Sequence, residues 1–219
     1  MIRTVAIIAC SLWLLGCATR IPGMDDDYVR DIQRRQKDVM DNMDTIEAQS
    51  QIMQQMMSDP DLPAWHEQRE KMALALGDRQ FDKPFDRVFD SMTVALATLG
   101  CRVQNMERIS GYITASIPEL PPEQLKALQK QGTRQYVVAK GYPADILDRK
   151  TGAFETPDMS AMVNQWRGGL TLSMVKQGPE LTKIKLRFDN IYYPGLVEEY
   201  YAVVWRAVDK QIFLDKGLD

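Results

Sequence analysis

The stretch DKPFDRVFDSMTVALATLGCRVQNMERISGYITASI (residues 82–117) carries the clearest structural pattern in this chain. Its first half predicts a helix, with Asp82 at the cap, Pro84 in the first turn and Gly100 at the stop. Apolar residues recur there at helical spacing, which predicts one buried face. That face comprises Phe85, Val88, Phe89, Met92, Leu96 and Leu99.

The second half of the stretch predicts two strands around a turn near Ile109 to Gly111. Beyond it, a small helix is expected over 118–132 and a terminal helix over 195–217. Six strands are predicted in all: 79–81, 101–107, 111–117, 133–141, 167–178 and 181–193. The last two alternate apolar with polar residues, as strands with one buried face do.

These elements predict an α+β fold. We expect a two-layer sandwich of an antiparallel sheet with helices on one face, preceded by a long N-terminal, coiled-coil-like helix. The compact domain is expected to cover 79–219. A long loop from Tyr142 to Asn164 interrupts it, and loops of this length are often functional.

The 82–117 stretch resembles the helix-grip-like domains of periplasmic lipoproteins, such as the BamC-type accessory subunits of outer-membrane assembly. That resemblance implies a helix packed over a curved sheet and an accessory, non-catalytic role. The long N-terminal helix and the Tyr142–Asn164 loop depart from the family pattern, so the resemblance implies no particular partner. The matching positions are Phe85, Val88, Phe89, Leu96, Leu99, Gly100, Gly111, Tyr112 and Ile113.

The chain begins MIRTVAIIACSLWLLGC (residues 1–17), with basic Arg3 before an apolar run. The run is shorter than the roughly 20 residues that span a bilayer, and the pattern is typical of a secretory signal. Leu14-Leu15-Gly16-Cys17 resembles the lipobox of bacterial lipoproteins. The resemblance implies a signal peptide over 1–16, acyl chains such as palmitate on Cys17, and a tether over 17–24. Because Ala18 rather than Asp follows, it also implies the periplasmic face of the outer membrane.

Residues 25–58 contain a seven-residue repeat that predicts a long helix with a coiled-coil seam. The seam could serve self-association, could pack against a partner or the protein's own domain, or could stay solvated. The candidate partner-binding residues are Ile32, Val39, Met43 and Ile46. A turn and a connecting helix are expected over 59–78.

The sequence contains no constellation typical of catalysis, and we expect no enzyme activity, metal or cofactor. Cys101 is left without a partner once Cys10 leaves with the signal and Cys17 is acylated, which favours a buried, inert thiol. His66 is the only histidine, too few for a metal site. The net charge of −3 argues against nucleic-acid binding.

Two functions remain open at this point. The first is a lipid-anchored scaffold or accessory subunit of an envelope complex, and the second is a lipoprotein that binds a small apolar ligand such as a lipid. A tyrosine- and tryptophan-rich group near the C-terminus could line a groove or pack in the core. It consists of Tyr192, Tyr193, Tyr200, Tyr201 and Trp205.

Overall fold

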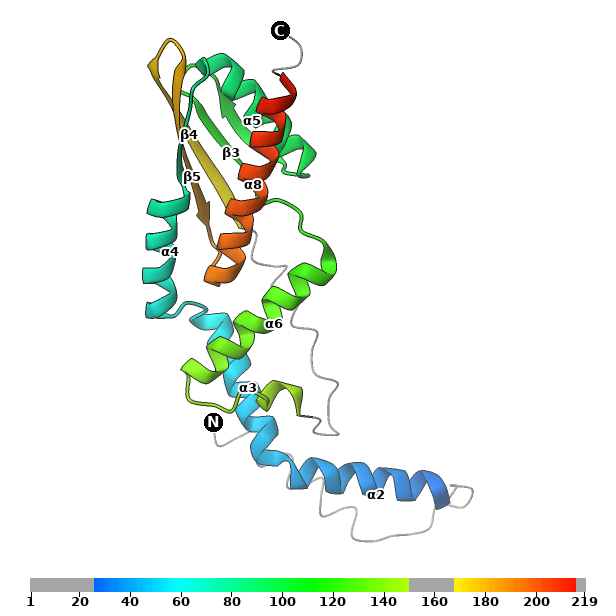
Figure 1. Cartoon of the computed structure of the whole chain (residues 1–219). Coiled ribbons are helices and arrows are strands. Elements are labelled where there is room, and N and C mark those ends of the chain that lie inside the picture. Colours follow the sequence, from blue (N-terminus) through cyan, green and yellow to red (C-terminus); the bar gives the residue numbers. More distant parts are fainter. Residues whose placement is uncertain (1–25, 150–167, 216–219) are drawn as a thin grey trace. The chain divides into compact units, whose positions relative to one another are not determined.

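The computed structural model describes residues 26–149 and 168–215 (Figure 1). The chain divides into two compact units at Ile46 and Glu47, and each is described by itself. The helices are α2 (Asp26–Asp41), α3 (Met43–Ser58), α4 (Pro63–Leu76), α5 (Phe85–Thr98), α6 (Pro122–Ala139) and α8 (Pro194–Asp215), with a 3-10 turn η1 (Ile146–Asp148). The strands are β1 (Asp78–Phe81), β2 (Val103–Glu107), β3 (Tyr112–Ser116), β4 (Gly169–Gly178) and β5 (Leu181–Asp189).

The larger unit contains a five-stranded antiparallel sheet in the order β1-β5-β4-β3-β2. Leu172 on β4 lies opposite Ile113 on β3 and Leu186 on β5, so these apolar residues form one row across the sheet. All three are fully buried. The α+β class predicted from the sequence is therefore confirmed.

Helices α5 and α8 pack side by side on this apolar face of the sheet (Figure 1). Most of the predicted face of α5 is buried, including Val88 and Phe89, and Val204 of α8 is buried in the same core. Burying a side chain of this size stabilises the fold by roughly 1.5–3 kcal/mol. One detail of the prediction is wrong. Pro84, not Asp82, occupies the N-cap of α5, because the helical turns begin only at Phe85.

The strand predicted over 133–141 is wrong, because α6 continues through these residues to Ala139. The sheet therefore has five strands rather than six. Tyr136 and Val137 are residue types that favour strands, but here they lie in a helix and their side chains are buried. Packing against α3 and α4 overrides their β preference, as tertiary contacts often do.

A second, smaller core forms where α3, α4, α6 and η1 meet within the larger unit. The Tyr136 hydroxyl donates a hydrogen bond of 2.7 Å to the carbonyl oxygen of Asp59. Gln49 Nε2 donates to the carbonyl oxygen of Ile146 at 2.7 Å, which ties η1 to α3. The core residues are Ile52, Met56, Leu62, Trp65, Tyr136, Val137 and Ile146.

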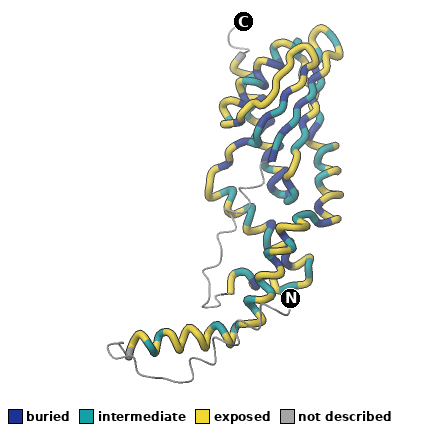
Figure 2. The backbone as a smooth tube through the Cα atoms, turned by 180° about the vertical axis from the view of Figure 1, so that it is seen from behind, coloured by how far each residue is buried: buried dark blue, intermediate teal, exposed yellow. Residues whose placement is uncertain are grey.

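The helix expected over 25–58 is present as two helices, α2 and α3, separated by Asn42. The Asn42 side-chain amide donates to the carbonyl oxygen of Asp38 at 2.7 Å. Such local side-chain bonds compete with regular helix and are a physical reason for the break. Figure 2 shows α2 as mostly exposed. Of the helices that the structure describes, none is long and apolar enough to cross a membrane.

Candidate ligand-binding pocket

A pocket of about 930 Å³ lies between α6, the ends of β3 and β4, and the first turns of α8. Its volume falls within the range of about 300–1,000 Å³ that is common for small-molecule sites. Figure 1 shows α6 set beyond the ends of the strands, and residues between Asp189 and Leu196 also line the pocket.

The lining of the pocket separates by burial into two kinds of residue. Every buried lining residue is uncharged, and the larger ones include Met56, Trp65, Tyr136, Leu170, Ile191 and Leu196. The charged lining residues, Arg102, Glu119 and Asp189, are all exposed. The inner wall is therefore suited to apolar ligand groups, while the charged side chains of the lining lie where water reaches them.

Aromatic packing fixes the wall formed by α4, α6 and the segment before α8. The Trp65 ring lies 5.5 Å from that of Tyr193 and 6.1 Å from that of Tyr136, measured between ring centroids. Gly132 on α6 makes this possible, because a Cβ atom there would lie 2.8 Å from Cγ of Tyr193. Any larger residue at this position would push the tyrosine ring out of the wall.

Arg69 on α4 stabilises the same wall by hydrogen bonds to Asp61 and Tyr192. Its guanidinium donates two hydrogen bonds of 2.7 Å to the Asp61 carboxylate and a third, of 2.6 Å, to the carbonyl oxygen of Tyr192. Bidentate pairs of this kind are strong and directional. The hydrogen bond from Arg69 is also the main reason that the pKa of Asp61 lies below its ordinary value. Tyr192 and Tyr193 are thus held in place before a ligand arrives.

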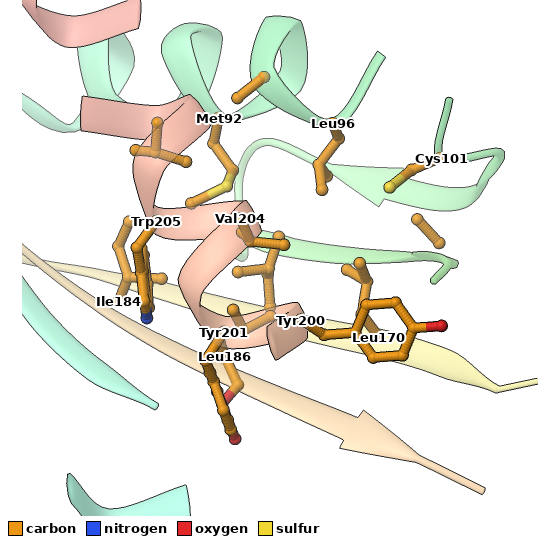
Figure 3. Packing of buried hydrophobic residues seen from close by; sticks show 14 of the residues in the cluster. Met92, Leu96, Cys101, Leu170, Ile184, Leu186, Tyr200, Tyr201, Val204 and Trp205 are labelled. Carbon is orange, nitrogen blue, oxygen red and sulfur yellow. The ribbon is translucent and has the colours of Figure 1, made fainter. Parts of the chain in front are cut away.

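Two polar side chains reach the lining from different helices. Tyr200 lines the pocket with a side chain that is only 2% exposed. Figure 3 shows its hydroxyl pointing away from Trp205. On α6, the side-chain oxygen of Gln129 is buried and has no hydrogen-bond partner within the described residues. Leaving this oxygen unpaired costs free energy, so it marks a place where a ligand can gain a hydrogen bond.

Burial sets the chemistry that Tyr200 can offer. Loss of solvation raises the pKa of this phenol to about 12, with a smaller contribution from Cys101. At neutral pH the group is therefore a neutral hydrogen-bonding hydroxyl and not a base or nucleophile. Tyr200 can therefore form hydrogen bonds with a ligand but cannot take a proton from it at neutral pH.

Some residues of the C-terminal aromatic group line the pocket and others pack in the core, the two alternatives that the sequence left open. Tyr192, Tyr193 and Tyr200 line the pocket, whereas the other two side chains are satisfied in the core. The Tyr201 hydroxyl donates to the carbonyl oxygen of Leu186 at 3.2 Å, and Trp205 Nε1 donates to that of Leu76 at 2.7 Å. Neighbouring aromatic residues on one helix thus have different roles.

The candidate partner-binding residues of the predicted seam belong to the smaller unit. Ile32 and Met43 are exposed, at 44% and 54%, and Val39 and Ile46 are half-buried. Cys17, the candidate lipidation site, lies outside the described residues, as do residues 150–164 of the Tyr142–Asn164 loop. The described part of that loop contains the turn η1, with Ile146 buried against α3 and α6.

The remaining residues that the sequence singled out have ordinary environments. Cys101 is buried, and desolvation raises the pKa of its thiol to about 11, which leaves it unreactive at neutral pH. His66 is exposed and lies 3.4 Å from Glu70. Within residues 26–149 and 168–215, no group of three histidine, cysteine or acidic side chains could hold a metal ion.

Sequence reasoning missed the part of the pocket contributed by α6. Leu125, Gln129, Gly132 and Tyr136 share one helical face and all line the pocket. Their spacing of four, three and four residues was the signal that could have found them. The sequence pattern predicts a helix for the first three of these residues but a strand beginning at Thr133 for Tyr136, so their common face was not recognised.

No protein-family model matches the chain, and no curated protein sequence matches it. The function of the pocket therefore has to be argued from its geometry.

Proposed function

We propose that this protein is a lipid-anchored envelope protein whose domain binds a small, mainly apolar molecule in the pocket between α6 and the sheet. Of the two functions that the sequence leaves open, ligand binding gains support from one observation: a cavity of about 930 Å³ with an uncharged buried wall. The lipobox-like Leu14-Leu15-Gly16-Cys17 supports the anchor and the periplasmic face of the outer membrane as the location.

Filling the pocket should abolish binding without unfolding the domain. Thr133 is a half-buried lining residue on α6, and Thr133→Trp places an indole where the ligand would lie. Threonine and tryptophan have similar helix propensities, so we expect stability to change by less than about 1 kcal/mol. Native mass spectrometry of the full-length protein purified from membranes should show a non-covalent mass that is absent after denaturation. That mass should fall at least tenfold in the variant.

Gln135→Trp is the matched control, because Gln135 lies two residues further along α6 and is exposed. It should retain the bound mass at the level of the unsubstituted protein. Denaturation leaves the covalent anchor on the protein and releases only the pocket ligand, so the two lipids are distinguished. Equal retention by Thr133→Trp and Gln135→Trp would show that the pocket is not the binding site.

A second candidate is the scaffold function, in which the helical seam binds an envelope partner or a second copy of the chain. Its support is the exposure of Ile32 and Met43 on α2 and α3, which also expose Tyr28, Met40 and Met57. Replacing Ile32 and Val39 together by Lys in the full-length protein should cancel any self-association seen by sedimentation. A monomer before and after substitution would leave only a different protein as the partner, to be tested by cross-linking in cells.

A further inference from the structure

Two polar side chains of the pocket restrict the kind of ligand that fits. Tyr200 comes from α8 and Gln129 from α6, so they approach the pocket from different elements. Tyr200 supplies a hydroxyl that donates or accepts. Gln129 supplies an amide whose buried end is unpaired, and turning the amide over would place its nitrogen there instead, equally in need of a partner.

The surroundings of these groups disfavour a charged ligand group. Tyr200 lies beside the buried Leu170 and Leu196, and no charged residue of the pocket lining is buried. The raised pKa of Tyr200 reflects the same poor solvation. Taking a carboxylate or a phosphate into such a place without a cationic partner costs several kcal/mol, whereas a hydroxyl or an amide can be satisfied by hydrogen bonds.

We propose that the pocket takes a neutral single-chain amphiphile, an acyl chain carrying an uncharged hydroxyl or amide head, which Tyr200 and Gln129 bind by hydrogen bonds. The acyl chain lies against the apolar lining, and the head pairs with the Tyr200 hydroxyl and the Gln129 amide. This inference rests on the proposed function and names the ligand class of the same site.

Monopalmitoylglycerol serves as the test probe, with methyl palmitate as a probe that has the same chain but no hydroxyl. Affinities are measured by titration with the full-length protein. Tyr200→Phe and Gln129→Leu should each weaken monopalmitoylglycerol about fivefold, the usual effect of one neutral hydrogen bond, and leave methyl palmitate within twofold. Palmitate, which carries a charged head, should bind the unsubstituted protein at least tenfold more weakly than monopalmitoylglycerol does.

Tyr201→Phe and Gln131→Leu are the matched controls. The Tyr201 hydroxyl donates a hydrogen bond to the backbone carbonyl oxygen of Leu186, so Tyr201→Phe should lose stability but keep its affinity for monopalmitoylglycerol. Tyr200→Phe should instead lose affinity for monopalmitoylglycerol, because it removes the hydroxyl that binds the head. Gln131 is an exposed neighbour on α6, and its variant should change neither property.

The outcomes separate this inference from the proposed function. Palmitate binding as tightly as monopalmitoylglycerol, or Tyr200→Phe binding monopalmitoylglycerol as tightly as the unsubstituted protein, overturns the neutral-head assignment. If neither probe binds, but a ligand that Thr133→Trp removes is retained from the membrane, the pocket function stands and the amphiphile class is wrong. If neither probe binds and no ligand is retained, both proposals fail.

Discussion

Gly111→Ala is expected to lower the free energy of unfolding by about 3 kcal/mol. Gly111 has a φ of +68°, which costs an alanine roughly 1 kcal/mol or more. Its added Cβ would also lie 2.2 Å from the carbonyl oxygen of Met174. That contact forces a shift of the backbone worth a further 1–3 kcal/mol, by analogy with overpacked cores. A melting temperature lower by roughly 6–12 °C should follow in a domain of this size.

The position of Gly111 explains why a single methyl group has so large an effect. Its carbonyl oxygen accepts a hydrogen bond of 2.8 Å from the Met174 amide. Its own amide donates to the backbone carbonyl oxygen of Arg108 in the turn. Moving Gly111 away from β4 therefore breaks the register of the β2–β3 hairpin against the rest of the sheet. The apolar row that includes Ile113, two residues further along, depends on that register.

Gly141→Ala supplies the control, since Gly141 has a φ of +88° but no atom within 4 Å of an added Cβ. Only the conformational cost remains there, about 1 kcal/mol. Thermal unfolding of both variants followed by circular dichroism measures the difference. Equal losses in the two variants would show that the contact with Met174 relaxes without cost and that the hairpin register is not tightly held.

The sequence predicts the layers of this fold well because their patterns are local. The α5 stripe and the alternation in β4 and β5 each fit one period, and the buried residues follow them. Local pattern gives the wrong element for residues 133–141. Thr133, Tyr136, Val137 and Val138 favour strands, yet the helix is decided by burial of Tyr136 in a core contributed by α3 and α4, which lie far away in sequence.

The pocket is less predictable than the fold for the same physical reason. Trp65, Gln129, Leu170 and Tyr200 are spread over the whole domain, and no motif connects them. The aromatic group near the C-terminus indicated a groove as one alternative, but not which of its members would face it. That distinction depends on tertiary packing: the Tyr201 hydroxyl donates to the carbonyl oxygen of Leu186 in the core, whereas Tyr200 lines the pocket.

Cys17→Ala is expected to remove the protein from the outer-membrane fraction completely. The reason is chemical: the resemblance to the lipobox places the acyl-accepting thiol at Cys17, and alanine has none. Each buried methylene contributes about 0.8 kcal/mol to anchoring, and two or more chains hold a protein stably where one does not. Without acylation, the protein should accumulate either uncleaved, with residues 1–16 retained, or in the soluble fraction. Immunoblots of fractionated cells and the intact mass of the protein measure both.

Cys10→Ala tests whether position or merely the presence of a cysteine matters. Cys10 lies in the same apolar run, seven residues before Cys17, but does not follow the Leu-Leu-Gly pattern. Its variant should mature and fractionate as the unsubstituted protein does. The described buried residues of the core formed by α5, α8 and the sheet run from Val88 to Ile212, so we expect neither variant to alter its melting temperature. Cys17→Ala protein that is still cleaved and still sediments with the outer membrane would rule out the lipid anchor, and a tether by protein contacts would have to replace it.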